Sequence, residues 1–168
     1  MEILTTIDSL EDAVEAHGQA ILRYCHLLLR DFHEAQDAVQ TVFMRAYATA
    51  KYDKALLYKI AYNQCMDVIR KRKRLFTFME QEKRDIAEFY TMDEGISDEL
   101  STALGTLTPA DRALVINRIV DGFDYTELSQ IYGTSSPALR KRYERAKKKL
   151  AEELKKQGFR TEGENGQK

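Results

Sequence analysis

The sequence has few of the residues that several common protein classes require. Among its 168 residues are 2 Cys, 2 Pro, 8 Gly and no Trp. So few Cys exclude a disulfide scaffold and favour a reducing compartment, and so few Pro and Gly exclude a Pro-rich or collagen-like chain. No apolar run approaches the roughly 18 residues of a membrane span, and the first residues form no export signal. We therefore expect a cytoplasmic globular protein with no membrane insertion.

The net charge of −1 conceals a strong segregation of charge along the chain. Residues 70–74 form an unbroken basic run, and residues 140–149 hold seven Lys and Arg against one Glu. The segment 80–99 between them holds eight Asp and Glu against two basic residues. A single basic run is often just a solvated helix end. Two such runs on either side of an acidic segment indicate two separate contacts with a polyanion.

The spacing of apolar residues predicts an all-α fold, because no stretch shows sustained alternation of period two. The expected helices of the first half cover residues 9–29, 33–50 and 54–74. Their apolar stripes, on which we place Val14 and Tyr47, predict an N-terminal helical bundle over residues 1–75. Residues 76–96 have weak periodicity and many acids, so we expect an acidic linker there.

Local start and stop signals predict a second helical domain over residues 97–157. A capping box that begins at Asp124 starts one helix, and Gly133 ends it. Pro137 then opens a longer basic helix. This is the helix-turn-helix layout, in which the second helix enters the major groove of DNA, although an ordinary helical hairpin with a solvated basic face has the same pattern. The polar residues 158–168 are expected to be a disordered tail.

Several short motifs occur in a fixed order along these two domains. The first domain holds Asp-Ala-Val-Gln at 37–40, Phe-Met-Arg-Ala-Tyr at 43–47 and Leu-Tyr-Lys-Ile-Ala-Tyr-Asn at 57–63. The second holds Leu-Thr-Pro at 107–109, Gly-Phe-Asp-Tyr-Thr-Glu-Leu at 122–128 and a basic helix with Arg-Tyr-Glu-Arg-Ala at 142–146. Residues 35–74 thus resemble region 2, and residues 103–150 resemble region 4, of extracytoplasmic-function (ECF) sigma factors. Two motif sets in the right order are more specific than either alone.

Two features depart from the family pattern. Leu56 stands where the family often has Trp, and the segment 48–55 is several residues short. In the family this loop helps to capture a flipped base of the −10 promoter element. We therefore expect −10 recognition to depend more on the helix that follows the loop.

The resemblance implies a sigma factor that binds core RNA polymerase and directs promoter-specific initiation of transcription. The implied partners are promoter DNA, the polymerase through its β′ clamp helices and β flap, and an anti-sigma factor as a further candidate. The implied polymerase-binding residues are Asp37, Gln40 and Thr41. The implied −10 readers are Lys59, Tyr62, Asn63, Arg70, Arg72 and Arg74. The implied −35 readers are Ser136, Ala138, Arg140, Lys141, Arg142 and Arg145.

The residues themselves leave other interpretations open. Tyr62 could stack on an unpaired base or pack as a partly buried aromatic residue of the bundle. The whole chain could be a helix-turn-helix regulator that binds duplex DNA as a dimer, or a sigma-like protein that binds a partner without melting promoters. Cys25 and Cys65 lie at apolar helix positions and are expected in the core. No nucleophile–base pair, phosphate loop or metal motif is present, so we expect no enzyme, cofactor or metal.

Overall fold

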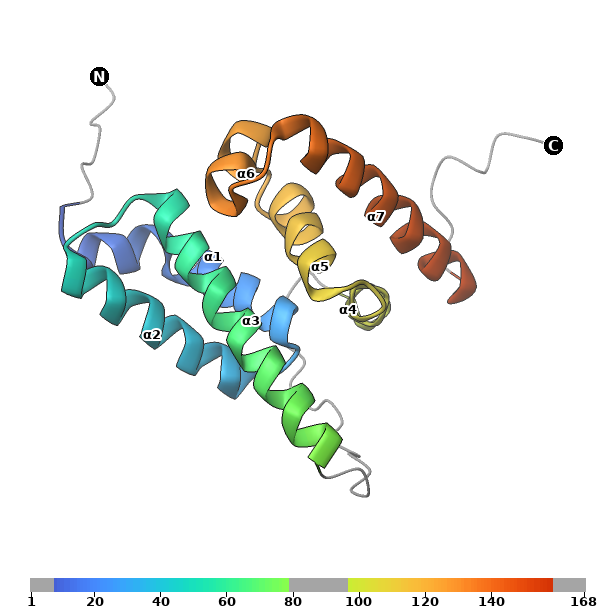
Figure 1. The fold of residues 1–168 in the computed structure, drawn as a ribbon, viewed down its shortest axis with the longest axis horizontal. Coiled ribbons are helices and arrows are strands. Elements are labelled where there is room, and N and C mark those ends of the chain that lie inside the picture. Colours follow the sequence, from blue (N-terminus) through green and yellow to red (C-terminus); the bar gives the residue numbers. More distant parts are fainter. Residues whose placement is uncertain (1–7, 79–96, 159–168) are drawn as a thin grey trace.

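The computed structural model describes residues 8–78 and 97–158, and every regular element in these ranges is helical (Figure 1). The N-terminal elements are α1 (Leu10–Leu29), α2 (Phe32–Thr49) and α3 (Lys54–Phe78). The C-terminal elements are α4 (Asp98–Gly105), α5 (Pro109–Val115), the π-helix η1 (Ile116–Val120), α6 (Tyr125–Tyr132) and α7 (Ser136–Lys156). The all-α prediction is confirmed. None of these described helices is both long and apolar enough to cross a membrane.

The first three helices form the bundle that the apolar spacing predicts. Ser9 and Asp31 cap α1 and α2, because each side chain accepts a hydrogen bond from the backbone N–H three residues further on. Both predicted core cysteines are buried. Two inward placements are wrong, since Val14 is 45% exposed and Tyr47 is 66% exposed. Each directly follows a buried Ala, and neighbouring residues on a helix point about 100° apart.

The C-terminal domain contains the predicted capping box and glycine turn. The Asp124 carboxylate accepts from the backbone N–H of Glu127 at 2.8 Å, and the Glu127 carboxylate accepts from that of Asp124 at 3.2 Å. Gly133 ends α6 with a left-handed φ of 63°, which glycine adopts without steric cost. The apolar residues that hold α6 against α7 are buried, namely Leu128, Ile131 and Leu139. The helix-turn-helix layout therefore forms as predicted.

The boundaries of the linker and tail differ in part from the sequence pattern. Helix α3 continues to Phe78, beyond Arg74, so the first residues of the predicted 76–96 linker are helical. The remainder of that linker, 79–96, lies outside the described residues, as do residues 159–168 of the predicted 158–168 tail.

The two domains lie against each other, with α3 beside α6 and with α1 in contact with α5 and η1 (Figure 1). Arg112 of α5 joins them from a buried position. Its Nη1 donates to the carbonyl of Leu28 in the last turn of α1 at 2.5 Å. Its Nε and Nη2 donate to the carbonyls of Leu104 and Leu107 at 2.9 and 3.2 Å. Burial lowers the pKa of this guanidinium to about 10. The sequence pattern predicts two domains but not this contact between them.

Candidate nucleic-acid interface

Helix α2 presents the predicted polymerase-binding residues on its outer face. Asp37 and Gln40 are exposed, and Thr41 is half-buried with its hydroxyl donating to the Asp37 carbonyl at 3.1 Å. The adjacent Ala38 and Val42 are buried in the bundle. The two exposed polar side chains are therefore free of any role in the core. They stand where a partner can reach them.

The same helix exposes two large apolar side chains, one of which sequence analysis missed and the other of which it placed inward. Met44 is 70% exposed, and Tyr47 follows it almost one turn later. Positions 40, 44 and 47 follow the i, i+4, i+7 spacing of one helix face. Met44 and Tyr47 therefore form an exposed apolar surface that continues from the polar surface around Gln40. Helical periodicity could have predicted this exposure, because Phe43 and Ala46 are buried and the positions next to them on the helix then point outward.

The predicted −10 readers on α3 fall into two groups. Lys59 and Asn63 are exposed. Tyr62 is half-buried, with its ring packed edge-on against Tyr132 of α6 at a centroid distance of 5.0 Å. Tyr62 therefore packs against an aromatic residue of the other domain, a contact that neither base stacking nor packing within the bundle anticipates.

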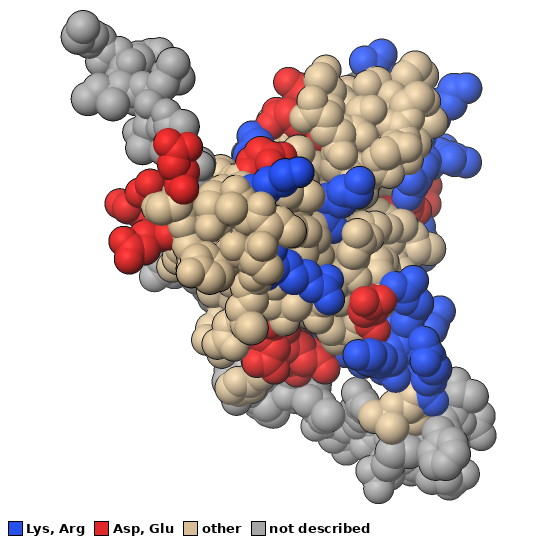
Figure 2. Space-filling model, turned by 60° about the vertical axis from the view of Figure 1, so that its left-hand side comes forward, with Lys and Arg blue, Asp and Glu red and all other residues tan. Residues whose placement is uncertain are grey.

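The basic run at the end of α3 is only partly available to DNA. Figure 2 shows Lys and Arg side chains crowded low on the molecule beside the grey residues, where α3 ends. Arg70 pairs with Asp67 on the same helix, and Arg72 pairs with Glu34 of α2. Arg74 is exposed. The structure therefore turns Arg72 back toward the bundle.

The predicted −35 readers lie on or beside the exposed face of α7. Arg140, Lys141 and Arg145 are exposed. Arg142 is half-buried and reaches Asp111 of α5, with 3.4 Å between its Nη2 and the carboxylate. Ser136 and Ala138 are half-buried at the start of the helix. The Ser136 hydroxyl donates to a backbone carbonyl of α6 at 3.3 Å, so it helps to fix the turn between the two helices.

An aromatic residue that sequence analysis missed lies under Arg140. The Arg140 guanidinium carbon is 5.0 Å from the ring centroid of Tyr125, and that of Arg118 is 4.9 Å from the same centroid. Tyr143 lies beside Tyr125, with 6.5 Å between the ring centroids. Guanidinium groups are attracted to aromatic faces at such distances. Tyr125 therefore limits where the Arg140 side chain can lie.

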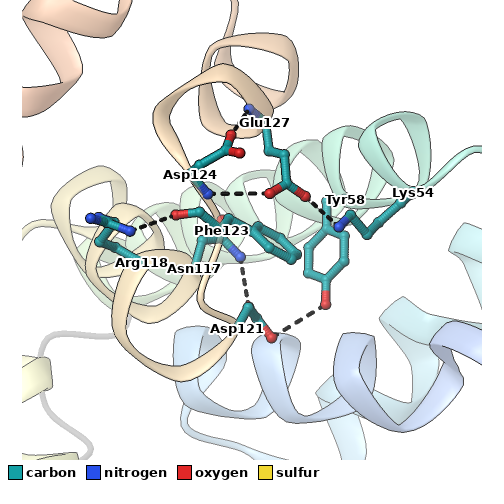
Figure 3. Close-up of polar contacts among 8 residues, drawn as sticks. All are labelled: Lys54, Tyr58, Asn117, Arg118, Asp121, Phe123, Asp124 and Glu127. Carbon is teal, nitrogen blue, oxygen red and sulfur yellow. Dashed lines mark hydrogen bonds and ion pairs between the residues drawn. The ribbon is translucent and has the colours of Figure 1, made fainter.

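A polar cluster joins the two domains at their contact, and we define it as the interdomain cluster of Tyr24, Tyr58, Asn117, Asp121 and Tyr132 (Figure 3 shows part of it). The Tyr58 hydroxyl and the Asn117 amide donate to the two Asp121 oxygens at 3.4 and 2.9 Å. The Tyr132 hydroxyl donates to Asn117 and shares a 3.2 Å hydrogen bond with the Tyr24 hydroxyl. Burial raises the pKa of the Asp121 carboxyl and of all three tyrosines.

Among the described residues, no group of His, Cys, Asp and Glu could hold a metal ion. The hydrogen bond that the Cys65 thiol makes to Cys25, together with burial, raises the pKa of Cys65, so the thiol is protonated in the core.

Comparison with known proteins places both domains in one class. Sigma-70 region 2 matches residues 13–75, and Sigma-70 region 4 matches residues 97–150. The chain is 25% identical to the ECF RNA polymerase sigma factor SigE of Mycolicibacterium smegmatis, over 91% of this chain and 64% of SigE. It is 26% identical to SigW of Bacillus subtilis, over 88% of this chain and 90% of SigW.

The fold also resembles a solved structure, that of the sigma factor RpoE in complex with the anti-sigma factor NepR from Bartonella quintana. The TM-score is 0.74 at 24% identity, over 86% of this chain and 96% of that one. The fold and the order of the two matched regions are those of the sigma-70 class. Within that class, the chain belongs to the ECF sigma factors of bacterial RNA polymerase. This family consists of non-enzymatic factors of transcription initiation, and the resemblance drawn from the motifs is confirmed.

Proposed function

We propose that the chain binds core RNA polymerase and directs it to a specific set of promoters. Region 2, the N-terminal bundle, reads the −10 element, and region 4, the C-terminal domain, reads the −35 element. The observation that carries the proposal is the capped helix-turn-helix whose second helix exposes Arg140, Lys141 and Arg145 on one face. The protein acts in the cytoplasm and carries out no reaction of its own.

Polymerase binding is assigned to the outer face of α2, which docks on the β′ clamp helices through Asp37 and Gln40, with Thr41 beside them. Region 4 docks on the β flap. Replacing both Asp37 and Gln40 with Ala should weaken core binding and leave the melting temperature almost unchanged, because both side chains are exposed. A matched control is Glu15→Ala, which removes an exposed acid from α1. Unchanged core affinity of the double variant in a titration would remove the assignment.

Reading of the melted −10 strand is assigned to Asn63 and Tyr62, with Lys59 and the basic run of α3 on the backbone phosphates. An Asn side chain can bond a base edge, and a Tyr ring can stack on an unpaired base. Arg70 and Arg74 hold phosphates from the solvent side of α3. Arg72 contributes less, because it already pairs with Glu34.

Reading of the −35 duplex is assigned to α7. Arg140 is the best base-reading candidate, since Tyr125 holds its guanidinium and a planar guanidinium can bond guanine through two hydrogen bonds. Lys141 and Arg145 contact phosphates or base edges. Ser136 and Ala138 bring the start of α7 close to the groove. Arg142 bonds Asp111 and serves mainly to hold α7 on α5.

The test is run-off transcription with purified core polymerase on a library of −35 variants. Arg140→Ala should cost about 1–3 kcal/mol at one base position and relax specificity there. Arg142→Ala should weaken all −35 sequences alike, because its loss shifts the whole helix. The control is Lys156→Ala at the far end of α7. If Arg140→Ala transcribes every variant with wild-type ranking and strength, this helix is not the reader.

Dependence on the polymerase separates this function from its main alternative. A helix-turn-helix regulator binds its duplex without polymerase and needs a repeated half-site. A sigma factor with a net charge near zero should bind duplex DNA weakly alone, because few phosphates are neutralised. An anti-sigma factor is proposed as a regulator, since the RpoE structure that this fold resembles holds one.

A further inference from the structure

Glu144 is the single acid in the basic part of α7. Residues 140–149 hold seven Lys and Arg, and Glu144 is the only Asp or Glu among them. Leu139, Ala146 and Leu150 mark the buried side of the helix. At about 100° per residue, Glu144 lies roughly 140° from Leu139 around the helix axis, and it is exposed. The acid therefore stands near the middle of the surface that faces away from the domain.

Two of the proposed −35 readers flank this acid. Around the helix axis, Arg140 lies about 40° to one side of Glu144 and Arg145 about 100° to the other. Both arginines are exposed. Along the axis, Glu144 follows Arg140 by four residues, which is about 6 Å at 1.5 Å per residue. This step corresponds to one or two base pairs, since each base pair spans about 3.4 Å. Glu144 is therefore placed to meet a base close to the one that Arg140 meets.

The Glu144 carboxylate is not engaged in holding region 4 together. In the described part of the chain it has no hydrogen-bond or ion-pair partner. Arg140, one turn earlier, places its guanidinium carbon 5.0 Å from the ring centroid of Tyr125, so this cation is drawn toward α6. Lys141 and Lys148, the other basic residues one turn away, are exposed. A negative charge on a surface that approaches phosphates weakens binding, so its presence there calls for a compensating contact.

The chemistry of the major groove supplies such a contact. An ionised carboxylate only accepts hydrogen bonds. The groove edges of guanine and thymine offer it only acceptors, which repel it, whereas cytosine offers the N4 amine and adenine the N6 amine. Adenine also carries the N7 acceptor beside its amine, so a carboxylate is better matched to cytosine. This selectivity is the reverse of that of an arginine, which only donates and is matched to guanine.

We propose that Glu144 is a specificity-determining residue of region 4, which accepts a hydrogen bond from the N4 amine of one cytosine in the −35 major groove. That cytosine lies one or two base pairs from the base that Arg140 reads. The proposal rests on the proposed function, because its ligand is the −35 duplex. It adds an acidic contact to a surface otherwise assigned to cations. The carboxylate lowers affinity for every other base at that position and so contributes discrimination rather than affinity.

The experiment measures competition binding of −35 variants by the complex of the full chain with core polymerase. The wild-type complex should prefer cytosine at one position by roughly tenfold or more, the value of one hydrogen bond to a charged group. Glu144→Ala should lose this preference. Glu144→Gln should shift it toward adenine, because an amide side chain bonds both N6 and N7 of adenine. The control is Glu152→Gln, which removes an exposed acid further along α7 and should leave the ranking of bases unchanged. A wild-type ranking for Glu144→Ala at every position overturns the proposal.

A modified base tests the hydrogen bond itself. N4-methylcytosine still pairs with guanine but carries a methyl group in place of the amine hydrogen that faces the major groove. Placing it at the preferred position should weaken binding of the wild-type complex roughly tenfold, the same hydrogen-bond value, and should affect the Glu144→Ala complex much less. An equal effect of the methyl group on both complexes overturns the proposal, because the amine is then not what Glu144 recognises.

The position of the effect separates reading from support. If Glu144 only pairs with Arg140 on the DNA, Glu144→Ala will relax the same base position as Arg140→Ala and no other. That result overturns the proposal, whereas loss of preference at a different position supports it.

Failure of this proposal can be told apart from failure of the proposed function. If the wild-type chain transcribes with core polymerase and only the Glu144 variants lack the expected effect, the proposed function stands. If the wild-type chain does not bind core polymerase, the proposed function fails and no −35 ranking is measured.

Discussion

The two proposed DNA-reading surfaces of this sigma factor differ in how accessible their side chains are. On α7 the side chains of Arg140, Lys141 and Arg145 are exposed, and the Tyr125 ring already lies against the Arg140 guanidinium. On α3 the exposed Asn63 neighbours a Tyr62 that is packed against the other domain. Side chains of similar chemistry thus differ in availability. We therefore expect −35 reading to depend on local folding alone, and −10 reading to depend also on the relative position of the two domains.

The largest effect is expected from disrupting the packing that holds α7 against the rest of region 4. Leu139 is fully buried between the helices of the helix-turn-helix, and Leu139→Ala should destabilise region 4 by about 2–5 kcal/mol. Recognition of −35 duplexes should be lost as the helix pair loosens. Chemical denaturation and run-off transcription measure the two effects. Leu57→Ala makes an equivalent cavity in the bundle and serves as the control. A cost below about 1 kcal/mol for Leu139→Ala would contradict the packing described here.

Two substitutions on α3 sharpen the comparison at region 2. Asn63→Ala should reduce open-complex formation by the equivalent of about 1–3 kcal/mol, the value of one well-formed base contact. Core binding should stay intact, and a premelted −10 template should not rescue the defect, because base reading is what is lost.

Tyr62→Ala removes a stacking ring and a contact with Tyr132 at once. It should therefore show a smaller net defect than Asn63→Ala, since loss of the contact with Tyr132 leaves this face of α3 more accessible and offsets part of the lost stacking. Potassium permanganate footprinting of the melted strand measures both variants. A Tyr62→Ala defect that clearly exceeds that of Asn63→Ala would show that the contact with Tyr132 does not limit −10 reading.

A smaller effect is expected from removing the support beneath Arg140. Tyr125→Leu should relax −35 discrimination by about 0.5–1 kcal/mol, the usual size of an exposed cation–π contact. Tyr125→Phe keeps the aromatic face and should retain wild-type discrimination. Competition binding of −35 variants by the polymerase complex measures the difference. If the Leu and Phe variants discriminate equally, the ring does not position Arg140.

The smallest effect is a pH dependence centred on Asp121. Burial raises the pKa of its carboxyl above 3.8, while the contacts of Asn117, Arg23 and Tyr58 act in the opposite direction. The folded protein therefore binds more protons than the unfolded chain in this range, so the contribution of Asp121 to stability falls as pH rises through the raised pKa.

Asp121→Asn cannot ionise and lacks this contribution. The melting temperature of wild type relative to Asp121→Asn should therefore decline as pH increases from 3.8 upward. Thermal melts at a series of pH values measure the decline, with Glu15→Gln, an exposed site, as the control. A difference that grows with pH would mean that the favourable contacts of the carboxylate outweigh its burial.

Features set by neighbouring residues could be predicted from the sequence. The capping box at Asp124, the Gly133 turn and the buried face of α6 form as expected, because each depends on residues within about one turn of the helix. The outward positions of Asp37 and Gln40 follow from the same periodicity. Family membership follows from motif order, which needs no three-dimensional knowledge.

Features set by residues far apart in the chain could not be predicted. Tyr24 and Tyr132 are 108 positions apart, and nothing local to either marks the other as its partner. The same is true of Arg72 and Glu34. Their ion pair engages an arginine that the sequence pattern assigns to a DNA phosphate. From sequence alone, a tyrosine on an amphipathic helix is equally able to stack on a base, to be buried in the core or to pack against another domain. Only packing decides among them.

Arg112 makes the contact between the two domains visible at the end of one helix. The last carbonyls of a helix have no partner within that helix, and in α1 one of them, that of Leu28, is bonded by a guanidinium from the other domain. When the domains separate, α1 loses this external cap and its final turn should fray. Amide hydrogen exchange just after Leu28 should then speed up, so any separation of the domains can be followed in the unlabelled native chain.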